Sequence, residues 1–273
     1  ANIRETDAIA HVLRCFEDED ITHVDGRVNP IEDAATIETE LMLADLESIE
    51  KRRAGLVRKL KGNDKEAQDQ DRLLSLAQEA ISDDRPARTV EVAAEDVRAW
   101  RILGLITAKP VLYVCNVEED AAAEGNAHSA AVAGLAAEQG AASVVISAAI
   151  EEEISQLSDE DRDEFLADLG LEEAGLDRLI RAGYGLLGLR TYFTAGPKES
   201  RAWTIHAGAL APQAAGVIHG DFEARFIRAE TIGYDDYVTL GGEQPAKEAG
   251  KMRAEGKAYE VADGDVLHFL HGA

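Results

Sequence analysis

The sequence predicts an α/β protein in which a parallel sheet carries an inserted antiparallel helical hairpin and is followed by a small α+β domain. Short apolar runs typical of buried strands lie at 8–16, 111–116 and 142–146. A helix-like stretch at 128–139 joins the last two, as a parallel pair requires. From Leu189 the pattern changes to short alternating strands, which indicates a second domain.

The hairpin is predicted by a seam of the coiled-coil kind that begins near Ala34. Its members follow a spacing of alternating four and three residues: Met42, Leu46, Ile49, Arg53, Leu56 and Leu60. Residues 61–64 interrupt it, and a second helical stretch ends before 83–86, where Pro86 disfavours helix. At roughly 1.5 Å per residue the hairpin is about 40 Å long.

The remaining elements follow from local periodicity and turn residues. Helices are expected at 94–107, 158–169 and 172–187, with Ser158 as an N-cap. After Leu189 we expect strands at 192–194, 202–205, 226–232, 237–240 and 266–270, and helices at 212–219 and 243–250. Asp263-Gly264 predicts a tight turn before the last strand.

Composition favours a cytoplasmic protein. The 273 residues carry a net charge of −25, which disfavours nonspecific binding to polyanions and predicts no DNA sequence specificity. No apolar run approaches the roughly 20 residues of a membrane span. Cys15 and Cys115 lie in predicted strands, and without a signal peptide we expect reduced buried thiols.

A basic cluster breaks the acidic trend near the predicted hairpin tip. It contains one acid, Asp64, and seven basic residues: Lys51, Arg52, Arg53, Arg58, Lys59, Lys61 and Lys65. It is either an RNA or ribosome contact or simply a solvated helix face. The next candidates for such a contact lie in the near-neutral C-terminal part: Lys247, Lys251, Arg253 and Lys257.

The tetrapeptide Asn116-Val117-Glu118-Glu119 follows a predicted strand, where P-loop GTPases carry the Asn-Lys-x-Asp sequence that reads guanine. A phosphate-binding Gly-x-x-x-x-Gly-Lys-Ser/Thr loop occurs nowhere in the 273 residues. Taken alone, the tetrapeptide is more often a turn. The small-residue loop Ser147-Ala148-Ala149 after the next strand favours a base site.

Longer runs resemble the Obg-like ATPase (YchF) family. They are IRETD (3–7), RCFE (14–17), TYFTAGPKESRAWTI (191–205), APQAAG (211–216) and GKMRAEGK (250–257). The resemblance covers essentially the whole chain and begins just after the family's second switch region, so we expect an N-terminally truncated form. It implies an incomplete P-loop NTPase sheet with the inserted hairpin, and a C-terminal β-grasp (TGS) domain.

The resemblance also implies domain limits and site residues. The partial nucleotide-binding domain is expected at 1–30 and 96–188, the hairpin at 31–95 and the TGS domain at 189–273. Asn116, Val117 and Glu119 would contact the base, Val117 through its main chain, with Ser147 and Ala148 facing it. ATP is expected to bind with Mg²⁺ and GTP more weakly. No catalytic residue and no metal ligand is expected in this chain.

Other polar groups are discounted. The spacings of His219, Asp221, His268 and His271 are not those of zinc sites. The acidic runs at 17–20 and 151–153 are interpreted as solvated surface. The sequence therefore predicts a YchF-type ATPase that associates with ribosomes or other RNA. The alternative is a non-catalytic interaction protein that uses only the hairpin and the β-grasp domain.

Overall fold

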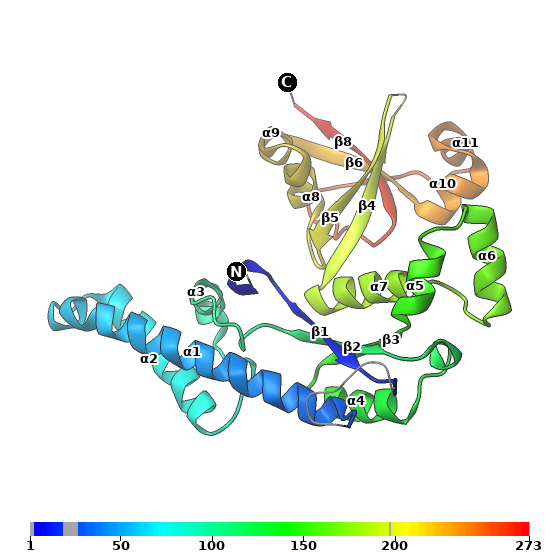
Figure 1. Cartoon of the computed structure of the whole chain (residues 1–273). Coiled ribbons are helices and arrows are strands. Elements are labelled where there is room, and N and C mark those ends of the chain that lie inside the picture. Colours follow the sequence, from blue (N-terminus) through cyan, green and yellow to red (C-terminus); the bar gives the residue numbers. More distant parts are fainter. Residues whose placement is uncertain (1–2, 19–26, 197, 273) are drawn as a thin grey trace. The chain divides into compact units, whose positions relative to one another are not determined.

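The computed structural model describes residues 3–18, 27–196 and 198–272. The chain forms two compact units, Ala1–Leu186 and Leu187–Ala273. The first combines a parallel sheet with a long helical hairpin, and the second holds a mixed sheet with short helices (Figure 1). The predicted α/β class is confirmed.

The sheet of the first unit is parallel and has the order β1-β2-β3. Its strands are β1 (Ile9–Arg14), β2 (Val111–Asn116) and β3 (Ala142–Ile146). All three were predicted from apolar runs. Helix α4 (Ala127–Glu138) makes the crossover from β2 to β3, beginning one residue earlier than the sequence predicts.

Both faces of β2 are buried, which explains its continuous apolar sequence. On one face Tyr113 and Cys115 pack in a cluster with Val132 of α4. On the other, Leu112 and Val114 pack beneath α7 (Gly175–Leu187). The predicted free, buried state of the two cysteines is confirmed, but Cys15 and Cys115 share one cluster despite their separation in sequence.

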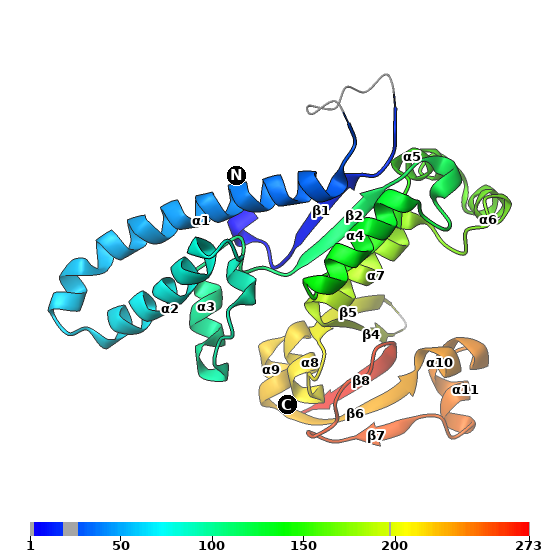
Figure 2. The ribbon, with the colours of Figure 1, turned by 90° about the horizontal axis from the view of Figure 1, so that it is seen from below.

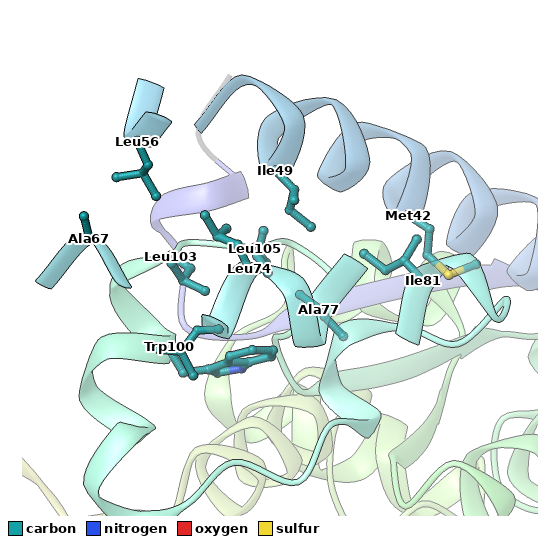
Figure 3. Close-up of a cluster of buried hydrophobic side chains, with 12 residues drawn as sticks. Met42, Ile49, Leu56, Ala67, Leu74, Ala77, Ile81, Trp100, Leu103 and Leu105 are labelled. Carbon is teal, nitrogen blue, oxygen red and sulfur yellow. The ribbon is translucent and has the colours of Figure 1, made fainter. Parts of the chain in front are cut away.

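The hairpin consists of α1 (Pro30–Lys61) and α2 (Lys65–Ser82), which run antiparallel (Figure 2). Three predicted seam residues of α1, Met42, Ile49 and Leu56, are buried against α2 and Trp100 (Figure 3). At the tip, Asn63 has φ 56° and Asp64 caps α2 by accepting the Ala67 amide at 3.0 Å. The interruption at 61–64 is confirmed.

Asp45 fixes the base of the hairpin. This carboxylate of α1 is fully buried, and it accepts hydrogen bonds from the amides of Ile106 (3.0 Å) and Thr107 (2.8 Å) and from the Thr107 hydroxyl (2.9 Å). Arg4 pairs with it at 2.8 Å. Since Thr107 lies shortly before β2, Asp45 joins the hairpin to the start of the central strand.

The helix predicted at 94–107 is shorter than expected. A 3-10 turn at Ala94–Asp96 leads into α3 (Val97–Ile102), and Gly104, with φ 59°, stops the helix. Two further helices in this unit are α5 (Ala148–Ile154) and α6 (Asp159–Asp168). Ser158 caps α6 as predicted, accepting the Asp161 amide at 3.3 Å.

The second unit holds a five-stranded mixed sheet of order β5-β4-β8-β6-β7. Its strands are β4 (Leu189–Ala195), β5 (Ser200–His206), β6 (Phe226–Gly233), β7 (Arg253–Glu255) and β8 (Asp265–His271). β4 pairs parallel with β8, and the other described pairs are antiparallel. Helix α8 (Ala211–Ile218) packs on one face, where the buried Tyr192 hydroxyl donates to the Ala214 carbonyl at 2.8 Å.

One predicted strand is wrong. Residues 237–240 belong to helix α10 (Tyr234–Leu240). Asp235 and Asp236 occupy its first turn, where acids favour the positive end of the helix dipole. Gly241, with φ 84°, ends it. The short helices α9 (Gly220–Ala224) and α11 (Glu243–Glu248) complete the unit.

Within the described parts of the chain, no helix is both long enough and apolar enough to cross a membrane.

Candidate functional site

The carboxyl ends of β2 and β3 lie side by side, because the register pairs Asn116 with Ile146. The Asn116 Oδ1 accepts a hydrogen bond from the Ala148 amide at 2.9 Å. The Val117 amide donates to the Ile146 carbonyl at 2.9 Å. The two loops that the sequence predicts to flank a base are therefore joined to each other.

Val117 can face a ligand only through its main chain. Its side chain is 3% exposed and packs in the cluster that contains Cys15 and Cys115. Its amide is already bonded to Ile146, so the carbonyl is the group left to meet a base. A lysine at this position, as guanine readers carry, would put its charge in that core.

Ser147 is buried, with 2% of its surface exposed, and its hydroxyl has no hydrogen-bond partner among the described residues. It stands at the N-cap of α5 without bonding to the helix amides. An unsatisfied buried hydroxyl costs about 1–3 kcal/mol. The Oγ atom is itself covered, so a ligand at this edge would reach it only after the loop moved.

Glu119 is exposed at the start of a 3-10 turn, Glu119–Ala121, and its carboxylate makes no hydrogen bond or ion pair with any residue that the structure describes. The neighbouring residue Glu118 instead holds this loop to Asn126. Its carboxylate oxygens accept from Asn126 Nδ2 at 3.1 and 3.0 Å. Of the predicted base contacts, Glu119 is therefore the one not tied to the joined loops.

Asn126 was not singled out from the sequence. Its Nδ2 also donates to the Cys15 carbonyl at 2.6 Å, and its Oδ1 caps α4 by accepting the Ser129 amide at 3.0 Å. It thus ties the end of β1, the loop after β2 and helix α4 together. An Asn three residues before Ser129, at the start of a helix-like stretch, is a capping signal that could have identified it.

Glu151 corrects the interpretation of 151–153 as solvated surface. Its carboxylate accepts the amides of Gly175 (2.7 Å) and Leu176 (3.0 Å) and so caps α7. The bond also explains Gly175, because a Cβ there would lie 2.9 Å from Glu151 Oε1. The acidic run at 17–20 falls partly outside the described residues.

The two buried thiols next to the site interact with each other. The hydrogen bond to Cys115, and then burial, raise the pKa of Cys15 well above its usual range. The same hydrogen bond lowers the pKa of Cys115. Both thiols are buried, so neither is open to a ligand. Among the described residues, no group of three or more His, Cys, Asp and Glu side chains is arranged to hold a metal ion.

The basic residues near the hairpin tip differ in whether they have partners within the protein. Arg53 is held across the hairpin, where its Nε donates to Asp71 Oδ1 at 2.9 Å and its NH1 donates to Gln78 at 2.6 Å. The others make no ion pair within the described residues: Lys51, Arg52, Arg58, Lys59, Lys61 and Lys65. Arg53 is therefore a structural clasp, and six charges remain open to a partner.

The C-terminal basic candidates divide in the same way. Lys251 pairs with Asp236 at 3.1 Å, and Arg253 lies 3.7 Å from both Glu255 and Asp265. Lys247 and Lys257 are exposed and unpaired within the described residues. Two of the four are thus available without breaking an internal contact.

Comparison with known proteins gives consistent matches along the chain. Residues 189–271 match the sequence family YchF-GTPase_C, described as a protein of unknown function (DUF933). The chain is 53% identical over 269 residues to the ribosome-binding ATPase YchF of Escherichia coli O157:H7, covering 98% of this chain and 74% of the relative. The protein of the same name from Bacillus subtilis (strain 168) is 50% identical over 271 residues, with 98% and 74% covered.

Solved structures agree. The Schizosaccharomyces pombe YchF GTPase matches with a TM-score of 0.81 and 34% identity, over 98% of this chain and 73% of that one. A GTP-binding protein from Pyrococcus horikoshii OT3 shares the fold, with a TM-score of 0.58 and 16% identity over 99% and 80% of the two chains. The sequence resemblance is confirmed by these matches, and the chain belongs to the YchF family.

Proposed function

We propose that this chain is the base-reading and partner-binding part of a ribosome-associated ATPase. The Asn116–Ala148 hydrogen bond carries the nucleotide half of the proposal, because it holds both predicted base loops in one arrangement before any ligand arrives. Polar groups that are already held in their bound arrangement lose little conformational entropy when a ligand binds, so the ligand binds more tightly. The names of the relatives support ATP as the nucleotide and the ribosome as the partner.

The proposed base contacts are the Asn116 side chain, the Val117 carbonyl, the Ser147 hydroxyl and the Ala148 main chain. The amino group of adenine is a donor and suits the Val117 carbonyl, whereas guanine presents a carbonyl oxygen at the equivalent position. That difference favours ATP over GTP, since two facing acceptors leave both unpaired. Glu119 is a weaker candidate for a base contact, because its side chain is exposed and has no hydrogen-bond or ion-pair partner among the described residues.

The phosphates and Mg²⁺ need a cradle that the 273 residues do not contain in the form Gly-x-x-x-x-Gly-Lys-Ser/Thr. No residue of this chain is assigned to water activation. We expect the 273-residue chain to show no ATPase activity and to bind nucleotide more weakly than the low micromolar range, because phosphate and metal contacts supply most of the affinity.

The six unpaired basic residues near the hairpin tip are proposed as a ribosome contact, with Lys247 and Lys257 as the second candidates. The mixed sheet packed on α8 supports assigning the second unit as a TGS domain of the β-grasp kind. A ribosomal partner would place the protein in the cytoplasm.

A nuclear magnetic resonance titration of the amide signals tests the nucleotide half. ATP–Mg²⁺ should shift the Val117, Ser147 and Ala148 signals more than GTP–Mg²⁺ at equal concentration. Asn116→Ala, which releases the Ala148 amide, should reduce the shifts, and Ser143→Ala on the same sheet should not. Equal shifts for both nucleotides would refute the adenine preference. Their absence at millimolar nucleotide would favour the interaction protein that binds without nucleotide.

A further inference from the structure

Helix α3 has two sharply different sides. Trp100 and Leu103 point into the hairpin core and are 8% and 2% exposed. At about 100° per residue, the other side-chain positions fall in one outward sector. We call this surface the α3 face, and its residues line an open hollow of about 590 Å³: Ala94, Val97, Arg98, Arg101 and Ile102.

The α3 face is cationic and apolar at once. Arg98 and Arg101 are exposed, and their side chains make no ion pair or hydrogen bond with the described residues. Nearby arginines are used internally, as Arg72 is by Asp96 at 2.8 Å. On the same face, Val97 and Ile102 expose 38% and 70% of their surfaces.

We propose that the α3 face is a docking site for an acidic, amphipathic helix of a protein partner, with the arginines pairing its carboxylates and Ile102 and Val97 packing on its aliphatic side chains. The face is open and is formed by this one segment, and a helical ligand laid across it would present aliphatic and acidic side chains one turn apart. Arginine is enriched and lysine depleted at the centre of protein interfaces. Arginine is also one of the residue types enriched among the contacts that contribute most to binding.

RNA fits this face less well than it fits the hairpin tip. Phosphate contact rewards positive charge alone and gains little from an isoleucine that is 70% exposed. The tip, by contrast, offers four lysines and two arginines without ion pairs. The two surfaces thus differ in composition in the way that a protein contact and a phosphate contact differ.

The test uses the 273-residue chain and purified bacterial ribosomes, and it rests on the proposed function because the ribosome is taken to carry the partner. Three variants are compared by co-sedimentation: Arg98→Gln with Arg101→Gln, Ile102→Ser, and the control Leu43→Ser on α1. Leu43 is also an exposed aliphatic residue, at 60%. A photoreactive benzoylphenylalanine at position 102 then reports which molecule lies against the face.

We expect the arginine pair and Ile102→Ser each to weaken binding about tenfold, Leu43→Ser to leave it unchanged, and the cross-link to join a ribosomal protein through an acidic segment. Unchanged binding in both α3 variants overturns the inference alone. A cross-link to ribosomal RNA, with loss of binding only in the arginine variant, overturns it in favour of phosphate contact. If the unaltered chain does not sediment with ribosomes, the proposed function fails together with this inference.

Discussion

Replacing Ser147 by alanine should raise stability and lower nucleotide affinity at the same time. The Ser147 hydroxyl is buried and unpartnered within the described residues, so it costs about 1–3 kcal/mol in the ligand-free protein. Ser147→Ala removes that cost and also loses the packing contacts of one oxygen atom. We expect a net gain of about 1 kcal/mol in the free energy of unfolding. For a unit of this size that gain corresponds to roughly 2–4 °C in Tm.

Ser129→Ala is the matched control. Ser129 is also buried, but its hydroxyl accepts the Asn126 amide at 2.8 Å and donates to the Asn126 carbonyl at 2.9 Å. Alanine there should cost about 1 kcal/mol, as the loss of a helix cap does. Both variants are measured by urea denaturation, followed by fluorescence and by far-ultraviolet dichroism.

The ligand arm uses the same Ser147→Ala variant. If a base satisfies the hydroxyl, its loss should weaken ATP binding about 3- to 10-fold, the equivalent of one hydrogen bond. A variant that loses stability as Ser129→Ala does would show that the hydroxyl already has a partner in solution. In that case the reasoning that links Ser147 to a ligand is wrong.

Three other changes test other parts of the first unit. Asp45→Asn should lower the free energy of unfolding by about 3 kcal/mol or more, because the buried carboxylate accepts three hydrogen bonds and pairs with Arg4. Arg4→Met should lower it by less. A loss below about 1 kcal/mol for Asp45→Asn in urea denaturation would contradict this. Burial lowers the pKa of His11 despite the opposing charges of Glu38 and Asp33, so as the pH falls the unfolded chain binds a proton before the folded protein does. The free energy of unfolding should therefore fall as the pH drops below about 6.5 and level off below the folded-state pKa. His11→Gln should make this pH dependence smaller. Changing Arg52, Arg58, Lys59 and Lys61 together to Gln should lower ribosome affinity and reduce the slope of log affinity against log salt by up to about 3, whereas Arg53→Gln should weaken the hairpin and leave the slope unchanged.

The sequence predicts best those elements whose pattern of apolar residues fits one type of secondary structure and not the other. Strand β2 is apolar on both faces, and the seam of α1 repeats over several turns, so neither has a competing interpretation. Residues 237–240 are too short for periodicity to separate strand from helix, and there the acidic pair before them and Gly241 were the better signals.

The site was predictable only in part. Asn116 and the loop at Ser147 could be found because each follows an apolar strand. Their direct hydrogen bond, and the unsatisfied hydroxyl between them, depend on how the strands are paired, which local sequence does not encode. The same holds for Arg53 and Glu151, whose charges look solvated in the sequence but are used by distant partners.

The placement of Asp45 has a mechanical consequence. Its partner Thr107 comes shortly before β2, and Asn116 is the last residue of that strand. Asp45 therefore anchors α1 near the first residues of a strand about 20 Å long. The first turns of α1 pack near the other end of the same strand, because Ala34 lies in one cluster with Cys115 and Val117. The hairpin is thus attached along the whole length of β2, and α1 and β2 are expected to move as one body.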